Sequence, residues 1–301
     1  MKIDKIVFST SEEYSGFWNI QSKIWKSVFD IEPVCILFGK KENTNMKEDY
    51  GTIIEREFEK DLPKVLQITW SKFDYPKTEP DTVWMLGDID MVPLQKFYFT
   101  DNIKDAPENA YLHLNFAGIS LVRRGILDAF LKEGSESIAR SNGSYNTGAD
   151  LPGHYHVSKG SNFQKIFNLD RTFREQVDDI ASSHRHGLGP AGNSEKPQGV
   201  DEIVNAGGYY WCAEESYSSE KLFYAVQNKQ IEFYGYCYHN GHNRIDRSTW
   251  SNDKADYFYD KKRLSSGSEI VDIHCERPYE KQENALNEIV ELSGIFETVG
   301  V

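Results

Sequence analysis

The stretch Val83-Trp-Met-Leu-Gly-Asp88-Ile-Asp90-Met-Val-Pro-Leu94 is a short apolar run followed by two carboxylates. Turn-forming residues bound the run, which predicts a strand buried on both faces. In extended chain, Asp88 and Asp90 point to the same side, so both carboxylates can reach one cation. Two acids at the end of a buried strand are costly unless a cation neutralises them. The stretch therefore predicts a site for a divalent metal, Mn²⁺ or Mg²⁺, with phosphate oxygens completing its shell.

Strand and helix patterns alternate on the N-terminal side of this stretch. The segments with these patterns are strands at 5–10, 33–38 and 52–54 and helices at 17–29 and 62–73. Such alternation predicts an α/β fold: a mixed, mainly parallel, doubly wound sheet flanked by helices. In open sheets of this class, ligands bind at the carboxyl ends of the strands, which is where Asp88 and Asp90 lie.

The pattern beyond the acidic pair is less regular. The expected elements are strands at 110–123, 208–213, 231–236 and 270–274 and helices at 126–131, 219–228 and 282–296. Residues 134–162 are rich in Gly, Ser, Asn and His, and residues 182–200 are expected to form a long loop. No internal repeat or linker is visible. We therefore expect one domain over residues 1–301.

Charge and hydropathy exclude several classes of protein. The 34 basic and 47 acidic residues give a formal net charge of −13, whereas a nucleic-acid partner demands a basic surface. No window approaches the roughly 18 uninterrupted apolar residues of a membrane span, and the N-terminus lacks a signal-peptide core. The four cysteines are scattered, which indicates reduced thiols rather than disulfides. A cytoplasmic protein is expected.

Three stretches resemble one enzyme family. Leu86-Gly-Asp88-Ile-Asp90-Met-Val-Pro-Leu94 is similar to the Asp-x-Asp metal motif of nucleotide-sugar glycosyltransferases with the GT-A fold. Asn115-Phe-Ala117-Gly118-Ile-Ser-Leu resembles the Asn-Ala-Gly strand of retaining, glycogenin-like members, with one extra residue. Ile273-His274-Cys-Glu-Arg277-Pro278-Tyr279 resembles their C-terminal His-…-Lys-Pro-Trp segment, with a shorter spacing and Arg in place of Lys. The matches occur in the family's order.

The resemblance implies a metal-dependent glycosyltransferase with a GT-A-type (Rossmann-like) fold, in which residues 1–100 would form the nucleotide-binding half and residues 101–301 the acceptor-binding half. Such an enzyme would move a sugar from a nucleotide-sugar, with a UDP-sugar as first choice, to a hydroxyl of a glycan, protein or small molecule. Asp88, Asp90 and His274 would hold Mn²⁺ or Mg²⁺, and Arg277 would contact the diphosphate. The metal would neutralise charge on the leaving nucleoside diphosphate.

Further donor-binding candidates flank the predicted nucleotide site. Ser9, Thr10 and Tyr14 follow the first strand, where the family holds the base and ribose; the alternative is ordinary helix capping. Lys72, late in the helix before the acidic pair, could add positive charge near the phosphates. The alternative for Lys72 is a surface side chain with a buried stem.

The acceptor-side candidate is the stretch Gly207-Gly-Tyr-Tyr210-Trp211-Cys-Ala-Glu214-Glu215. Aromatic rings can bracket a sugar, and Glu214 or Glu215 could deprotonate the acceptor hydroxyl as a catalytic base. The stretch resembles the acidic segment of inverting GT-A enzymes. The alternative is that both glutamates stabilise the positive end of the following helix. The residues predicted to line the acceptor or donor-sugar pocket are Asn115, Gly118, His154, His156, Tyr210 and Trp211.

Two other functions fit parts of the sequence. Asp88-Ile-Asp90-Met-Val92 also matches the nucleophile motif of haloacid-dehalogenase-type phosphatases, in which Asp88 would attack phosphorus and Asp90 would act as general acid. That family places its motif after the first strand, whereas here strands precede it. A non-catalytic carbohydrate-binding protein would explain the aromatic residues but not the acidic pair. The choice between retaining and inverting stereochemistry is left open. Asn115–Leu121 and His274 favour the retaining families, whereas Glu214 favours inversion with a general base.

Overall fold

The computed structural model describes residues 1–114, 151, 153–185, 213–235, 243–245, 247 and 270–297. The chain divides into two compact units. Unit 1 comprises Met1–Glu57, Val83–Glu108 and Cys237–Val301, and unit 2 comprises Phe58–Thr82 and Asn109–Tyr236. Each unit is therefore assembled from segments that are distant in the sequence. The expected division into halves at residue 100 stays a prediction.

Unit 1 contains four parallel strands. They are β1 (Lys5–Ser11), β2 (Glu32–Phe38), β3 (Thr52–Arg56) and β4 (Val83–Leu86), hydrogen-bonded in the order β3-β2-β1-β4. In β1, Ile6 pairs with Pro33 of β2 on one side and with Met85 of β4 on the other. The side chains of β4 are all buried, as expected for a parallel strand that is covered on both faces. The buried strand predicted at 83–86 is confirmed.

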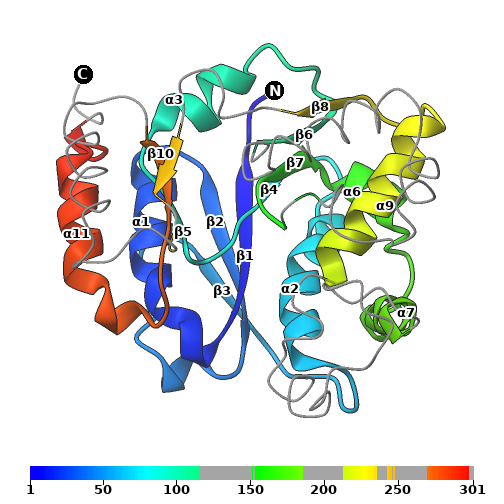
Figure 1. The fold of residues 1–301 in the computed structure, drawn as a ribbon, viewed down its shortest axis with the longest axis horizontal. Coiled ribbons are helices and arrows are strands. Elements are labelled where there is room, and N and C mark those ends of the chain that lie inside the picture. The colour runs from blue at the N-terminus through cyan, green and yellow to red at the C-terminus, as the bar shows by residue number, and fades with distance from the viewer. Residues whose placement is uncertain are drawn as a thin grey trace. The chain divides into compact units, whose positions relative to one another are not determined.

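A second, smaller sheet in unit 1 brings distant segments together. Its strands are β5 (Met91–Pro93), β10 (Ile270–His274) and β9 (Asn243–Ile245), in the order β5-β10-β9. The antiparallel pairing of β10 with β5 places Ile273 opposite Val92 and His274 opposite Met91. Figure 1 shows β5 and β10 side by side. The C-terminal segment is therefore fixed directly beside the residues that follow Asp90.

Helices cover the strands of unit 1. Helix α1 (Trp18–Ser27) packs on β2 and β5, while α3 (Lys96–Phe99) and α11 (Glu283–Leu292) complete the unit. Figure 1 shows α11 running beside α1. The ring of Trp25 on α1 packs against Phe29 and Phe99, with ring centroids 4.5 and 5.2 Å apart. This aromatic cluster fixes α1, and α1 carries a polar side chain to the turn that contains Asp88 and Asp90.

The described part of unit 2 contains α-helices and a set of short strands. The helices are α2 (Lys64–Asp74), α6 (Gly160–Phe167), α7 (Phe173–Arg185) and α9 (Ala213–Gln227), and the strands β6 (Tyr111–His113), β7 (His156–Lys159) and β8 (Phe233–Gly235) pair in the order β7-β6-β8. Strand β6 is antiparallel to β7 and parallel to β8. Trp70 of α2 stacks on Phe73 and meets Tyr217 of α9 edge-on, so aromatic rings form the core.

The predicted α/β class, with a mainly parallel sheet flanked by helices, is confirmed. Three local predictions differ from the structure. Helix α9 begins at Ala213 rather than at 219, β7 and the start of α6 occupy the end of the polar segment 134–162, and α7 extends into the expected loop at 182–200. Polar composition misled the prediction here, because a helix needs apolar residues on only one face. The helix at 126–131 lies outside the described residues.

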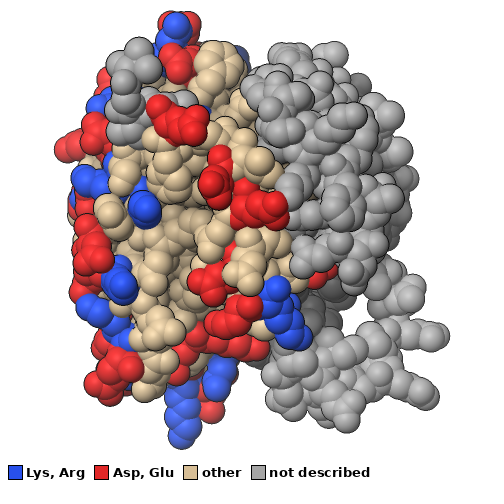
Figure 2. Space-filling model, turned by 90° about the vertical axis from the view of Figure 1, so that its left-hand side faces the viewer, with Lys and Arg blue, Asp and Glu red and all other residues tan. Residues whose placement is uncertain are grey.

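Surface charge is mixed on the face of unit 1 that carries α11. Acidic and basic side chains are interspersed on the described part of this face (Figure 2). Among the described helices, none is long and apolar enough to cross a membrane.

Gly87, between β4 and Asp88, is needed because the chain passes close to the core. A Cβ atom at this position would lie 2.5 Å from Cε1 of the fully buried Phe8. We expect Gly87→Ala to lower the free energy of unfolding by about 1–3 kcal/mol, the usual cost of overpacking a core. Urea denaturation followed by circular dichroism measures this change. Unchanged stability would show that Phe8 and the backbone adjust freely.

Candidate functional site

Asp88 and Asp90 lie in the turn that joins β4 to β5. The backbone N–H of Met91 donates to the carbonyl of Asp88 at 3.0 Å, so the chain reverses here. The argument that both carboxylates point to one side of an extended strand is therefore wrong. Asp88 is half-buried, whereas Asp90 is only 1% exposed. Of the two carboxylates, Asp90 thus carries the larger desolvation cost.

Gln21 of α1 holds this turn from inside the core. Its Nε2 donates to the carbonyl oxygens of Ile89 and Met91 at 3.1 and 2.6 Å. Its Oε1 accepts a hydrogen bond of 3.0 Å from Nε1 of Trp25. Gln21 is fully buried, and sequence reasoning missed it. The available signal was a glutamine on the apolar side of a helix, where an amide needs polar partners.

Strand β10 holds the turn from the other side. The backbone N–H of Cys275 donates to the carbonyl of Asp90 at 2.8 Å, directly after His274 pairs with Met91. The backbones of Asp90 and His274 are therefore neighbours although 184 positions separate them (274 minus 90). Two of the predicted metal ligands thus come together in unit 1.

Arg277 forms an ion pair with Asp90. Its Nε and Nη2 both lie on Oδ2 of Asp90, at 2.7 and 2.6 Å. Nε2 of His274 lies 3.6 Å from the same oxygen. The guanidinium of Arg277 also sits over the ring of Tyr14, 4.9 Å from its centroid. The structure therefore gathers four predicted residues, Tyr14, Asp90, His274 and Arg277.

The charges in this cluster reinforce one another. Burial raises the pKa of Asp90, but attraction to His274 and Arg277 outweighs it and leaves the pKa below its ordinary value. Burial lowers the pKa of Arg277, but the charges of Asp90 and Asp88 outweigh it and leave that pKa raised. Asp90 is therefore a carboxylate and Arg277 a cation at neutral pH. Asp88 acts on both groups electrostatically, so it belongs to the same site.

The side chains fit a divalent ion in their chemistry. Two carboxylates and an imidazole are ligands that Mn²⁺ and Mg²⁺ sites use. The carboxylates of Asp88 and Asp90 attract cations, as their joint effect in raising the pKa of Arg277 shows. Within the described part of the chain, however, no three His, Cys, Asp or Glu side chains are already gathered around one point. The guanidinium of Arg277 occupies the space beside Asp90 instead.

Ser9 and Thr10 lie among the last residues of β1, which extends to Ser11, so the prediction that they follow the strand is wrong. Val7 of β1 pairs with Leu86 of β4, so Ser9 and Asp88 both follow two residues later. Ser9 is half-buried, while Thr10 is 2% exposed and donates its hydroxyl to the carbonyl of Ser11 at 3.2 Å. Their predicted contacts with base and ribose stay predictions.

The remaining predicted polar residues belong to unit 2. Lys72 is only 2% exposed, so its surface alternative is wrong. A Cβ atom on Gly153 would lie 3.1 Å from Nζ of Lys72 and 3.3 Å from Oε1 of Glu214, so both charged groups face this glycine. Glu215 accepts a hydrogen bond of 2.9 Å from the backbone N–H of Gly153. Both glutamates lie in the first turn of α9, where the helix dipole favours a negative charge.

The two predicted histidines of the pocket lining are buried. His154 is 6% exposed, and His156 is fully buried with its Nδ1 3.0 Å from the hydroxyl of Tyr111. The ring of Phe73 also packs against His156. This geometry gives His156 a place in the core of unit 2, and its lining role stays a prediction. Asn115, Gly118, Tyr210 and Trp211 lie outside the described residues.

Helix α9, which carries both glutamates, is fixed to α7 by a polar triad. The hydroxyl of Tyr217 donates to Oδ2 of Asp179 at 3.0 Å, and Arg171 donates to both partners at 3.2 and 3.1 Å. Burial, together with the charge of Asp179, raises the pKa of Tyr217 to about 12. The position of Glu214 and Glu215 therefore depends on a tyrosine that keeps its proton in the folded state.

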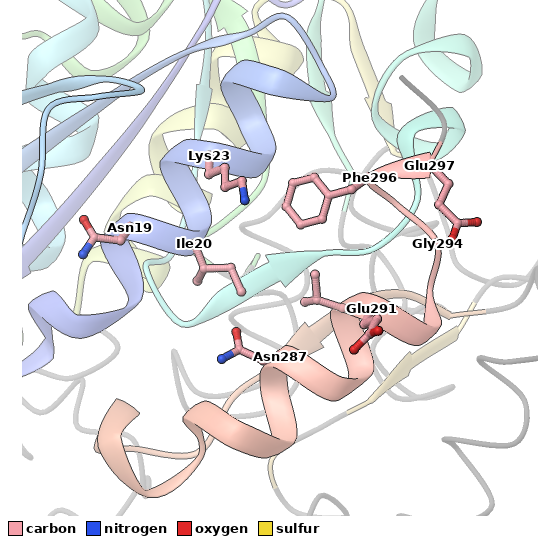
Figure 3. Close-up of a pocket in the computed structure, with 9 residues that line it drawn as sticks. Asn19, Ile20, Lys23, Asn287, Glu291, Gly294, Phe296 and Glu297 are labelled. Atoms are coloured by element: carbon pink, nitrogen blue, oxygen red, sulfur yellow. The ribbon is translucent and has the colours of Figure 1, made fainter. Parts of the chain in front are cut away.

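A separate cavity of about 430 Å³ lies in unit 1 between α1 and the end of α11 (Figure 3). Lys23 and Phe296 point toward each other at its edge, with Nζ 4.8 Å from the ring centroid. None of the residues around Asp90 lines this cavity. It is therefore not part of the acidic site.

No protein-family model matches this sequence, and no curated protein matches it. The solved structures that this chain matches include two glycosyltransferases. One is the galactosyltransferase LgtC in complex with donor and acceptor sugar analogs, with a TM-score of 0.44 and 10% identity over 96% of this chain and 95% of LgtC. The other is the bifunctional glycosyltransferase WbbM in its apo form, with a TM-score of 0.40 and 10% identity over 99% of this chain and 51% of WbbM. At these scores, neither likeness determines the activity of this chain.

The role of Gln21 can be tested with a substitution of similar volume. We expect Gln21→Leu to lower the free energy of unfolding by about 2 kcal/mol, because buried carbonyls at the acidic turn lose their donor. Thermal denaturation measures the loss, with Gln230→Ala, at an exposed glutamine, as the control. A Gln21→Leu protein as stable as the control would contradict this role.

The polar triad at α9 predicts a loss of stability at high pH. Tyrosine in the unfolded chain ionises near pH 10, while Tyr217 in the folded chain keeps its proton to about pH 12. The unfolded state therefore loses its proton first, and stability falls as pH rises through this window. We expect Tyr217→Phe to remove this part of the pH dependence in chemical denaturation between pH 9 and 12. Tyr50→Phe, at an exposed tyrosine, is the control. Parallel pH profiles for wild type and Tyr217→Phe would contradict the assignment.

Proposed function

We propose that this chain is a metal-dependent glycosyltransferase. It would transfer a sugar from a nucleotide-sugar, with a UDP-sugar as first choice, to a hydroxyl of a glycan, protein or small molecule. One observation carries the proposal: a buried carboxylate, Asp90, lies at the carboxyl ends of parallel strands and faces His274 and Arg277 from a distant segment. The site combines negative and positive groups, with one half-buried carboxylate, Asp88, beside them. Such a site suits a charged, metal-bound ligand such as a diphosphate.

The residues around Asp90 divide the task of donor binding. A divalent ion held by Asp88, Asp90 and His274 would neutralise charge on the leaving nucleoside diphosphate. The guanidinium of Arg277 has the planar donor geometry that binds phosphate oxygens in pairs. Tyr14 orients Arg277 through the contact of ring and guanidinium. Ser9 and Thr10, at the end of the neighbouring strand β1, are proposed to contact the base and ribose.

Unit 2 would supply the acceptor side. Glu214 is 3% exposed beside Lys72 and Gly153, and Glu215 is bound to the backbone of Gly153. A buried glutamate beside an ammonium group has the composition of a general-base site. Glu214 or Glu215 as the catalytic base remains part of the proposal.

Release of nucleotide from a panel of UDP-, GDP- and dTDP-sugars with Mn²⁺ tests this function. We expect one donor class to be cleaved and Asp90→Asn to reduce the rate by about a hundredfold or more, because it weakens the binding of the metal ion that would neutralise the developing diphosphate. Asp90→Asn keeps the shape of the side chain, and a thermal denaturation curve checks its fold. Asp81→Asn, at an exposed carboxylate before β4, is the matched control.

Two outcomes would contradict the proposal. Hydrolysis of a phosphomonoester that depends on Asp88, without cleavage of any nucleotide-sugar, would establish the phosphatase alternative. Binding of a sugar in calorimetry, without binding of any nucleotide, would indicate a carbohydrate-binding protein. Equal rates for Asp90→Asn and Asp81→Asn would remove Asp90 from the mechanism.

A further inference from the structure

One oxygen of Asp90 faces two partners. Arg277 donates twice to Oδ2, and His274 lies 3.6 Å from the same atom. A divalent ion shared by Asp90 and His274 would therefore stand next to the guanidinium of Arg277. Two cations at such a distance in a partly buried site repel each other strongly. The arrangement that the structure shows and a metal-bound arrangement thus exclude each other.

We propose that Arg277 competes with the divalent ion for Asp90, and that a nucleoside diphosphate ends the competition by binding the guanidinium. This inference rests on the proposed function. Without nucleotide, Arg277 neutralises Asp90 and the ion binds weakly. With nucleotide, the diphosphate takes over Arg277 while the ion takes over Asp90. Ion and nucleotide therefore bind cooperatively.

The backbone geometry determines which group moves. The backbone of Asp90 is fixed through its carbonyl, which accepts from Cys275, and through the flanking carbonyls, which accept from Gln21. His274 is fixed in β10. Arg277 lies beyond the end of β10, and its side chain is 23% exposed. The long arginine side chain can therefore leave Asp90 without any change in the sheet.

The exchange conserves charge at each stage. In the described arrangement, the guanidinium balances Asp90. When Arg277 moves to a diphosphate, it remains paired with an anion of the geometry that it binds best. Asp90 is then left with the ion. Neither the buried carboxylate nor the guanidinium is without a partner of opposite charge in either state, which avoids the large cost of an unpaired buried charge.

Calorimetric titration of Mn²⁺ into the full chain tests the competition directly. It is carried out with and without UDP, on the wild type, Arg277→Gln, Arg277→Lys and the control Lys23→Gln. Lys23→Gln removes one positive charge from the exposed surface of α1 in the same unit. Without UDP, we expect Arg277→Gln to bind Mn²⁺ about tenfold or more tighter than the wild type, because a hydrogen bond to a charged group is worth at least this much.

The other variants and the nucleotide complete the pattern. Arg277→Lys keeps the charge but loses the double contact, so its affinity for Mn²⁺ should fall between those of wild type and Arg277→Gln. The factor by which UDP tightens Mn²⁺ binding should be smaller in Arg277→Gln than in wild type. The reciprocal factor for UDP must change equally, since the coupling of two ligands is symmetrical.

Mn²⁺ binding by Arg277→Gln that is equal to or weaker than that of the wild type would overturn the inference and make the Asp90–Arg277 pair permanent. Cooperative binding of Mn²⁺ and UDP to the wild type would still support the proposed function. Absence of Mn²⁺ binding in every variant, with and without UDP, would overturn both the competition and the metal dependence. Binding of a nucleotide-sugar without metal, measured by the same method, would then show whether the transferase proposal survives in a metal-independent form.

Discussion

The cost of burying a carboxylate dominates this structure. Asp90 is 1% exposed, and a charge so far from water needs a partner of opposite sign. The partner, Arg277, lies in a segment that follows all of unit 2 in the sequence. Strand β10 carries that segment to the acidic turn by pairing with β5, and Gln21 holds the turn from the opposite side. The small sheet, the buried glutamine and the ion pair thus act together to stabilise the buried carboxylate of Asp90 and its turn.

The sequence predicts the parts of the fold that depend on local pattern. The strands β1, β2 and β4 are short apolar runs, and such runs report burial directly. The turn at Asp88–Met91 and the role of Gln21 were not predicted, because both depend on contacts between segments that are distant in the sequence. The start of α9 was predicted too late in the chain, at 219. The alternative offered for Glu214 and Glu215, that they stabilise the positive end of the following helix, agrees with their place in its first turn.

The candidate site was predicted by residue type more successfully than by geometry. Asp90, His274 and Arg277 do meet in the structure, and the order of the motifs along the chain pointed to them although the spacing from His274 to Arg277 departs from the family's. Their arrangement was not foreseen. An arginine and a metal ion can each neutralise a buried carboxylate, and the sequence does not distinguish between them. Lys72 and Glu214 lie together in unit 2, where Gly153 leaves room for both charged groups.

The origin of β10 in the C-terminal segment has a consequence for the order of events during synthesis. The ribosome delivers Asp90 and the parallel strands long before it delivers residues 270–277. Until then, the emerging chain holds an acidic turn with no strand beside it and no counter-charge, and ordering of this turn has to wait. A chain that ends before β10 would therefore lack both the backbone donor of Cys275 and the guanidinium of Arg277 at this turn.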